Sequence, residues 1–118
     1  MVFVGGGLGS ALRYLLGSLM NSSSNNIPFG TFTANVLGSL LIGVILGVAL
    51  KNNTLTSSQT LLLATGFCGG FTTFSAFAYE NYEFLKSGDY YSFGMYTIGS
   101  FIVAIIAVLF GLYISKGI

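Results

Sequence analysis

The chain has 118 residues, of which 53 % are hydrophobic and 6 % charged, and its net charge is +1. Soluble domains carry about 25 % charged residues, and a core of this size cannot bury so much apolar surface. The composition therefore predicts an integral membrane protein and argues against a nucleic-acid-binding surface. One cysteine and no histidine exclude an internal disulfide, a metal cluster and histidine acid–base chemistry. The first residues, Met-Val-Phe-Val, lack the basic region of a signal peptide, so none is expected.

Long, nearly uncharged runs follow one another along the chain. A helix needs roughly 20 mostly apolar residues to cross a bilayer, and these runs do not alternate in polarity as β-barrel strands do. The predicted spans are residues 2–20, 29–50, 57–85 and 90–115. We therefore expect an all-α membrane protein with one transmembrane domain over residues 1–118, and with both termini on the same side of the membrane.

The lysines of the connections give a weak orientation signal. Lys51 and Lys116 would lie on one side of the membrane and Lys86 on the other, whereas positive residues normally concentrate on the cytoplasmic side. Such a chain could insert in both orientations and form an antiparallel pair. Oligomerisation is also expected because four short helices make a bundle too thin to enclose a polar path comfortably.

The first span combines small residues with the only arginine of the chain. Gly5 and Gly9 are spaced by four residues, which favours close helix packing in lipid. Arg13 could extend to the membrane interface or pair with a carboxylate such as Glu80 or Glu83. A transport role is less expected for Arg13, because a fixed buried cation tends to trap an anion rather than pass it.

The second span carries a polar stripe. Thr31, Asn35 and Ser39 recur every four residues and share one helical face. Polar groups inside a membrane are costly and need an explanation. Two interpretations remain open: hydrogen bonds that join helices, or a polar path whose donors are the Asn35 amide and the two hydroxyls.

The third span contains the most unusual segment, Gly66-Phe67-Cys68-Gly69-Gly70-Phe71-Thr72-Thr73-Phe74-Ser75-Ala76-Phe77. Two glycines followed by two threonines are poor helix formers, so we predict a break between two half-helices in mid-membrane. A break leaves free carbonyl groups on one side and free N–H groups on the other, which are potential cation and anion sites. The ring edges of Phe74 and Phe77 carry partial positive charge and could contact an anion. Contact with lipid or core is the alternative for these two rings.

The fourth span has a shorter polar stripe. Tyr96 and Ser100 are one helical turn apart, and the next position on that face is Ala104. The stripe therefore ends after two members.

Three of these segments together resemble the Fluc (CrcB) family of fluoride channels. They are Gly69-Gly70-Phe71-Thr72-Thr73-Phe74-Ser75-Ala76-Phe77 with Glu80, Gly30-Thr31-Phe32-Thr33-Ala34-Asn35-Val36-Leu37-Gly38, and Gly9-Ser10-Ala11-Leu12-Arg13-Tyr14. The resemblance implies a dual-topology homodimer in the plasma or inner membrane, with two antiparallel pores that export fluoride passively and relieve its toxicity.

The resemblance also implies roles for individual residues. Fluoride would meet the pore-lining residues Phe74, Phe77, Asn35, Thr31, Ser75, Tyr96 and Ser100. The backbone carbonyls of Gly69 and Thr72 from both subunits would hold a structural sodium ion at the dimer interface. Arg13 and Glu80 match structural positions of the family. Ala104 stands where some relatives have a further hydroxyl, so the far end of the hydroxyl track departs from theirs.

Other classes of protein fit the sequence less well. A small multidrug exporter would need a carboxylate in the first span, which has Arg13 instead. A scaffold subunit would explain the glycines but not a mid-membrane break beside paired phenylalanines. An enzyme is not expected, since no nucleophile–base pair or cofactor loop is visible.

Overall fold

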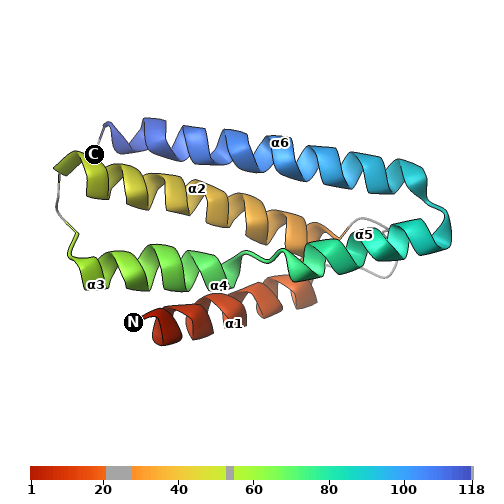
Figure 1. The fold of residues 1–118 in the computed structure, drawn as a ribbon, viewed down its shortest axis with the longest axis horizontal. Helices are drawn as coiled ribbons and strands as arrows, with labels where there is room; N and C mark the ends of the chain where they lie inside the picture. The colour runs from red at the N-terminus through yellow and green to blue at the C-terminus, as the bar shows by residue number, and fades with distance from the viewer. Residues whose placement is uncertain (21–27, 53–54, 118) are drawn as a thin grey trace.

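The computed structural model describes residues 1–20, 28–52 and 55–117. Its helices are α1 (Val2–Met20), α2 (Phe29–Asn52), α3 (Ser57–Thr60), the π-helix η1 (Leu61–Cys68), α4 (Gly69–Phe71), α5 (Ser75–Ser87) and α6 (Tyr90–Ser115). They form four segments that are long and apolar enough to cross a membrane, Val2–Met20, Phe29–Ala49, Ser57–Ser87 and Tyr90–Ser115. The four predicted spans are thus confirmed, and both termini lie at the same end of the bundle (Figure 1).

The third span is interrupted at the predicted segment, although not at its glycines. Gly69 is helical, with φ −63° and ψ −37°, and the helix continues to Phe71 before Thr72 turns to extended backbone at φ −85° and ψ 157°. The break is therefore confirmed, but it begins three residues after Gly69. The half of the span before the break contains the eight-residue π-helix η1, which the sequence analysis did not anticipate.

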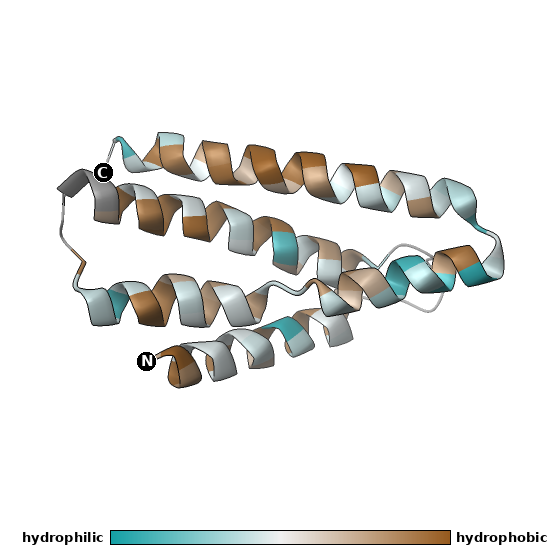
Figure 2. Cartoon of the chain, in the orientation of Figure 1, coloured by the Kyte–Doolittle hydropathy of each residue, from teal (hydrophilic) through white to brown (hydrophobic). Residues whose placement is uncertain are grey.

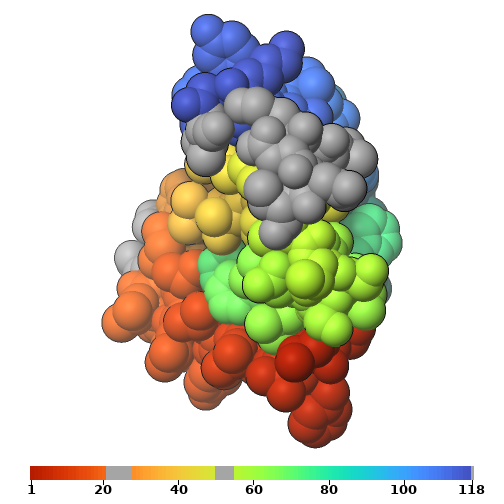
Figure 3. Space-filling model, turned by 90° about the vertical axis from the view of Figure 1, so that its left-hand side faces the viewer, coloured from red at the N-terminus to blue at the C-terminus, as the bar shows by residue number. Residues whose placement is uncertain are grey.

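Glycines bring two pairs of segments together in the bundle. Gly5 and Gly9 of α1 face the backbone of η1 and α4, and Gly43 of α2 faces Gly111 of α6. In lipid, such small residues allow helix backbones to approach closely. Figure 3 views the bundle from the end that carries both termini, where α1 lies directly against the start of the third span. The packing role predicted for Gly5 and Gly9 is confirmed.

The contact at Gly9 predicts a strong effect of a single methyl group. A Cβ on Gly9 would overlap the carbonyl oxygen of Phe67 and the amide nitrogen of Phe71, both of them backbone atoms. Gly9→Ala should therefore lower the free energy of unfolding by about 1–3 kcal/mol, as overpacking does elsewhere. Gly7→Ala is the matched control, because a Cβ there has nothing within 4 Å. Equal stability of both variants in a detergent unfolding titration would contradict this packing.

The outer surface of the bundle is strongly apolar. Only six of the 26 residues of α6 are buried inside the chain, and side chains such as Ile98, Phe101 and Ile105 are exposed. Figure 2 shows hydrophobic residues along most of α6 and along α2. This surface must face lipid or another protein surface, because exposing so much apolar surface to water is unfavourable.

The turn between the last two helices is closed by local hydrogen bonds. Gly88 adopts φ +80°, which favours glycine, and its N–H donates to the Leu85 and Phe84 carbonyls. Asp89 then caps α6, its side chain accepting from the Ser92 N–H at 3.1 Å. The turn holds α5 antiparallel to the start of α6 (Figure 1).

Candidate functional site

A cavity of about 370 Å³ opens beside the break, between α2, the third span and α6. Every described residue that lines it is uncharged, and the wall combines amide, hydroxyl and thiol groups with phenyl rings. The lining residues are Asn35, Gly38, Ser39, Ile42, Cys68, Gly69, Thr72, Thr73, Phe74, Phe77, Ser100, Phe101 and Ala104.

Asn35 of α2 holds the break from across the bundle. Its Oδ1 accepts from the backbone N–H of Thr73 at 2.8 Å, and its Nδ2 donates to the carbonyl oxygen of Thr73 at 3.2 Å. One side chain thus satisfies both backbone groups of a residue that lies outside any helix. An unpaired backbone group in a membrane would be costly, so Asn35 stabilises the interruption that exposes the cavity wall.

The break also releases carbonyl groups from their usual partners. In a continuous helix the N–H of Thr73 would donate to the carbonyl of Gly69, and the N–H of Ala76 would donate to the carbonyl of Thr72. Here the Thr73 N–H donates to Asn35, and the Ala76 N–H donates to Oγ1 of Thr73 at 3.2 Å. The carbonyls of Gly69 and Thr72 are therefore among those that lose a helical donor, and both residues line the cavity.

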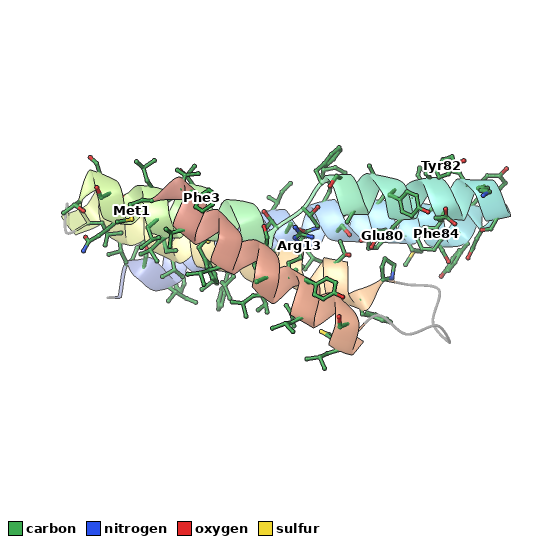
Figure 4. The ribbon with its side chains drawn as sticks, turned by 90° about the horizontal axis from the view of Figure 1, so that it is seen from below. Met1, Phe3, Arg13, Glu80, Tyr82 and Phe84 are labelled. Atoms are coloured by element: carbon green, nitrogen blue, oxygen red, sulfur yellow. The ribbon has the colours of Figure 1, made fainter. Side chains whose placement is uncertain are left out.

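Arg13 contacts the break rather than a carboxylate. Its Nε donates to the carbonyl oxygen of Gly70 at 3.2 Å, and the Ser10 hydroxyl donates to the same oxygen at 3.4 Å. Figure 4 shows Arg13 beside the break and Glu80 farther along the third span. Of the two alternatives for Arg13, the pairing with Glu80 or Glu83 is therefore not the one observed, because in a membrane a carbonyl that has lost its helical donor competes strongly for a cation.

Phe74 and Phe77 lie side by side at the cavity but in different surroundings. Their ring centroids are 5.9 Å apart with an interplanar angle of 45°. Phe74 precedes α5 and is 72 % exposed, whereas Phe77 is 7 % exposed and meets Phe101 edge to face at 5.8 Å. The cavity wall therefore contains one ring that is packed on most sides, that of Phe77, and one ring that is largely exposed, that of Phe74.

Thr31 and Tyr96 converge on Glu80. The Thr31 hydroxyl donates to Oε2 of Glu80 at 2.7 Å, and the Tyr96 hydroxyl donates to Oε1 at 2.7 Å. Short hydrogen bonds to a carboxylate are among the stronger ones in proteins. They tie α2, α5 and α6 together just beyond Phe77, whose ring lies 5.1 Å from that of Tyr96.

The residues predicted to line a pore occupy three different surroundings. Asn35, Phe74, Phe77 and Ser100 line the cavity, while Thr31 and Tyr96 bind Glu80 beyond it. Ser75 is exposed, and its hydroxyl shares a hydrogen bond of 3.3 Å with that of Thr73.

The sequence of the chain matches known proteins over nearly its whole length. The family described as CrcB-like protein, Camphor Resistance (CrcB), matches residues 1–112. The chain belongs to the CrcB family. It is 52 % identical over 118 residues to a protein of Gloeothece citriformis named fluoride-specific ion channel FluC, covering 98 % of this chain and 94 % of the relative. A protein of the same name from Phocaeicola vulgatus is 44 % identical over 117 residues, covering 98 % and 96 %. The resemblance read from the motifs is thereby confirmed.

The structure adds residues to the site of this CrcB protein that the sequence analysis did not single out. Cys68, Thr73 and Phe101 line the cavity. Thr73 could have been suggested by its place in the glycine–threonine segment. Cys68 and Phe101 gave no signal, because a cysteine or a phenylalanine in an apolar span reads as ordinary core.

The hydrogen bonds of Glu80 predict a structural cost for losing its charge. Glu80→Gln keeps the shape but leaves one acceptor oxygen for two hydroxyl donors, and its amide faces a hydroxyl as a second donor. We expect the free energy of unfolding to fall by about 1–3 kcal/mol. Glu83→Gln is the control, since Glu83 lies on the same helix and is exposed. An unfolding titration in which both variants match the original chain would rule out a structural role for this carboxylate.

Proposed function

We propose that this chain is the subunit of a fluoride-selective channel that passes the ion passively and is not an enzyme. The observation that carries the proposal is the cavity of about 370 Å³ at the break, whose described lining residues are all uncharged. The names of the relatives from Gloeothece citriformis and Phocaeicola vulgatus support the choice of fluoride.

The cavity wall suits a small, strongly hydrated anion. Moving a bare ion from water into an apolar medium costs tens of kcal/mol, so a path must supply donors. Asn35 and Ser100 offer polar hydrogens, and the edges of Phe74 and Phe77 offer partial positive charge. Thr31, Ser75 and Tyr96 extend this set of neutral groups. Neutral contacts favour conduction, because an ion must be able to leave each site as well as enter it.

A second copy of the chain would complete the path. Phe74 is 72 % exposed although it is a phenylalanine beside a polar cavity, and the bundle has a wide apolar outer face. An antiparallel homodimer of dual topology would cover this surface and form two pores. The weak lysine asymmetry supports such a pair, since Lys51 and Lys116 oppose only Lys86 across the bilayer.

A sodium ion would fit the same interface. Sodium is a hard cation that prefers oxygen ligands, and the carbonyls of Gly69 and Thr72 are among those that lose helical donors at the break. Two copies would supply four such carbonyls. A bound ion would neutralise their partial negative charge and hold the two subunits together.

The biological role follows from passive transport. In the plasma or inner membrane of a cell, surrounded by the lipid bilayer, such a channel would let fluoride leave down its gradient and so relieve its toxicity.

Halide efflux from liposomes that contain the purified protein tests the proposal. Fluoride- and chloride-selective electrodes should record fast fluoride release with little chloride release. Folded protein that releases neither ion would exclude channel function and would favour a scaffold role for the glycine-packed bundle. Equal release of both ions would exclude fluoride selectivity.

A further inference from the structure

Most polar hydrogens on the cavity wall are already committed to neighbouring oxygens. The Ser39 hydroxyl donates to the Asn35 carbonyl at 2.7 Å, and the Thr72 hydroxyl donates to the Cys68 carbonyl at 2.9 Å. One N–H of Asn35 donates to the Thr73 carbonyl at 3.2 Å. A hydroxyl has a single proton, so Ser39 and Thr72 have none left for an ion in the cavity.

Apart from the second N–H of Asn35, two further side chains on the wall keep their protons free. Ser100 is 9 % exposed, and its Oγ has no hydrogen-bond partner among the described residues. Cys68 is 2 % exposed with a free thiol, and the described part of the chain gives that thiol no partner either. Buried polar groups are normally satisfied, so an unsatisfied hydroxyl on a cavity wall indicates that something else binds there.

We propose that the Cys68 thiol is a further ion-contacting group of the path and, together with Ser100, receives the anion in the cavity. The inference rests on the proposed function and adds a residue to it. It also accounts for Ala104, which lines the same cavity one turn after Ser100 and supplies no hydroxyl. The thiol from the third span stands in for the donor that α6 lacks at that position.

A thiol has suitable chemistry for this role. The S–H group is a weak donor on a polarisable atom, so it can lower the cost of entry without holding the ion strongly. Conduction requires sites of this moderate strength. Because Cys68 is the only cysteine of the chain, its contribution can be removed or blocked without affecting another thiol.

Substitution and rescue test the proposal in reconstituted liposomes. Cys68→Ala should reduce fluoride efflux at least fivefold, and Cys68→Ala combined with Ala104→Ser should recover most of it, because a hydroxyl then faces the same cavity from α6. Ala64→Gly is the packing control. Ala64 is buried in the same π-helix but is not among the cavity-lining residues, so its variant should conduct normally.

Each outcome bears on the proposal. Unchanged efflux in Cys68→Ala would overturn it, and so would a loss that Ala104→Ser does not recover, since that result indicates a packing defect. If the original chain itself releases no fluoride, the proposed function fails, which is a separate result.

Blocking the thiol in the original chain provides a second measurement if Cys68→Ala does not fold. Methyl methanethiosulfonate adds a methylthio group to cysteine, and mass spectrometry reports its stoichiometry at the single site. Modification should lower fluoride efflux in proportion to labelling, and reduction of the mixed disulfide should restore it. Complete labelling with unchanged efflux would overturn the proposal, as would a thiol that the reagent fails to reach through the cavity.

Discussion

Asn35→Ala is expected to abolish fluoride efflux and to lower the free energy of unfolding by roughly 2–4 kcal/mol. The substitution removes both hydrogen bonds to Thr73, at 2.8 Å and 3.2 Å, and leaves two backbone groups without partners. Each unsatisfied buried group costs about 1–3 kcal/mol. Efflux from liposomes and unfolding in detergent measure the two effects separately.

Two further substitutions separate the roles of Asn35. Asn35→Asp keeps an acceptor for the Thr73 N–H but adds a negative charge to the cavity, so it should stop efflux even where the protein stays folded. Ser39→Ala is the matched control one turn along α2, because the Ser39 hydroxyl bonds within its own helix. Normal efflux in Asn35→Asp would contradict the place of Asn35 in the anion path.

Phe77→Ile is expected to reduce fluoride efflux more than tenfold while the protein remains folded. Isoleucine fills much of the same space but has no ring edge with partial positive charge. Phe77 is 7 % exposed and packs against Tyr96 at 5.1 Å, so the variant should also lose about 1–2 kcal/mol of stability through imperfect packing.

Phe74→Ile is the matched comparison at the neighbouring ring. Phe74 is 72 % exposed in the single chain, so its replacement should leave the stability of the isolated subunit unchanged and still reduce efflux. If Phe77→Ile lost only stability and conducted normally, the phenyl edges would have no part in conduction.

The four spans could be predicted because hydropathy depends on composition alone. The break was also predictable, since glycines and threonines in mid-membrane are poor helix formers. The position of the break was harder to predict. Gly70 stays helical because its missing side chain admits the backbone of Gly6, so a residue suspected of breaking the helix is used for packing.

The partners of the polar side chains depend on how the helices are rotated about their axes. Thr31, Glu80 and Tyr96 come from three different helices, and their spacing in the sequence does not indicate that they meet. A carboxylate partner was one of two alternatives for Arg13, yet its partner is the Gly70 carbonyl. Every residue has a backbone carbonyl that can accept a hydrogen bond. Which of these carbonyls lacks a helical donor can be known only once the position of the break is known.

The glycine contacts of α1 limit how the protein can move. Gly5, Gly9 and Arg13 repeat at intervals of four residues, so the packing contacts and the polar contact with Gly70 share one face of the helix. A rotation or slide of α1 would therefore drive backbone against backbone and detach the arginine in the same step. We therefore expect α1 and the half of the third span before the break to move as one rigid body, and any rearrangement of the cavity wall to involve the side chains of α2, α5 and α6.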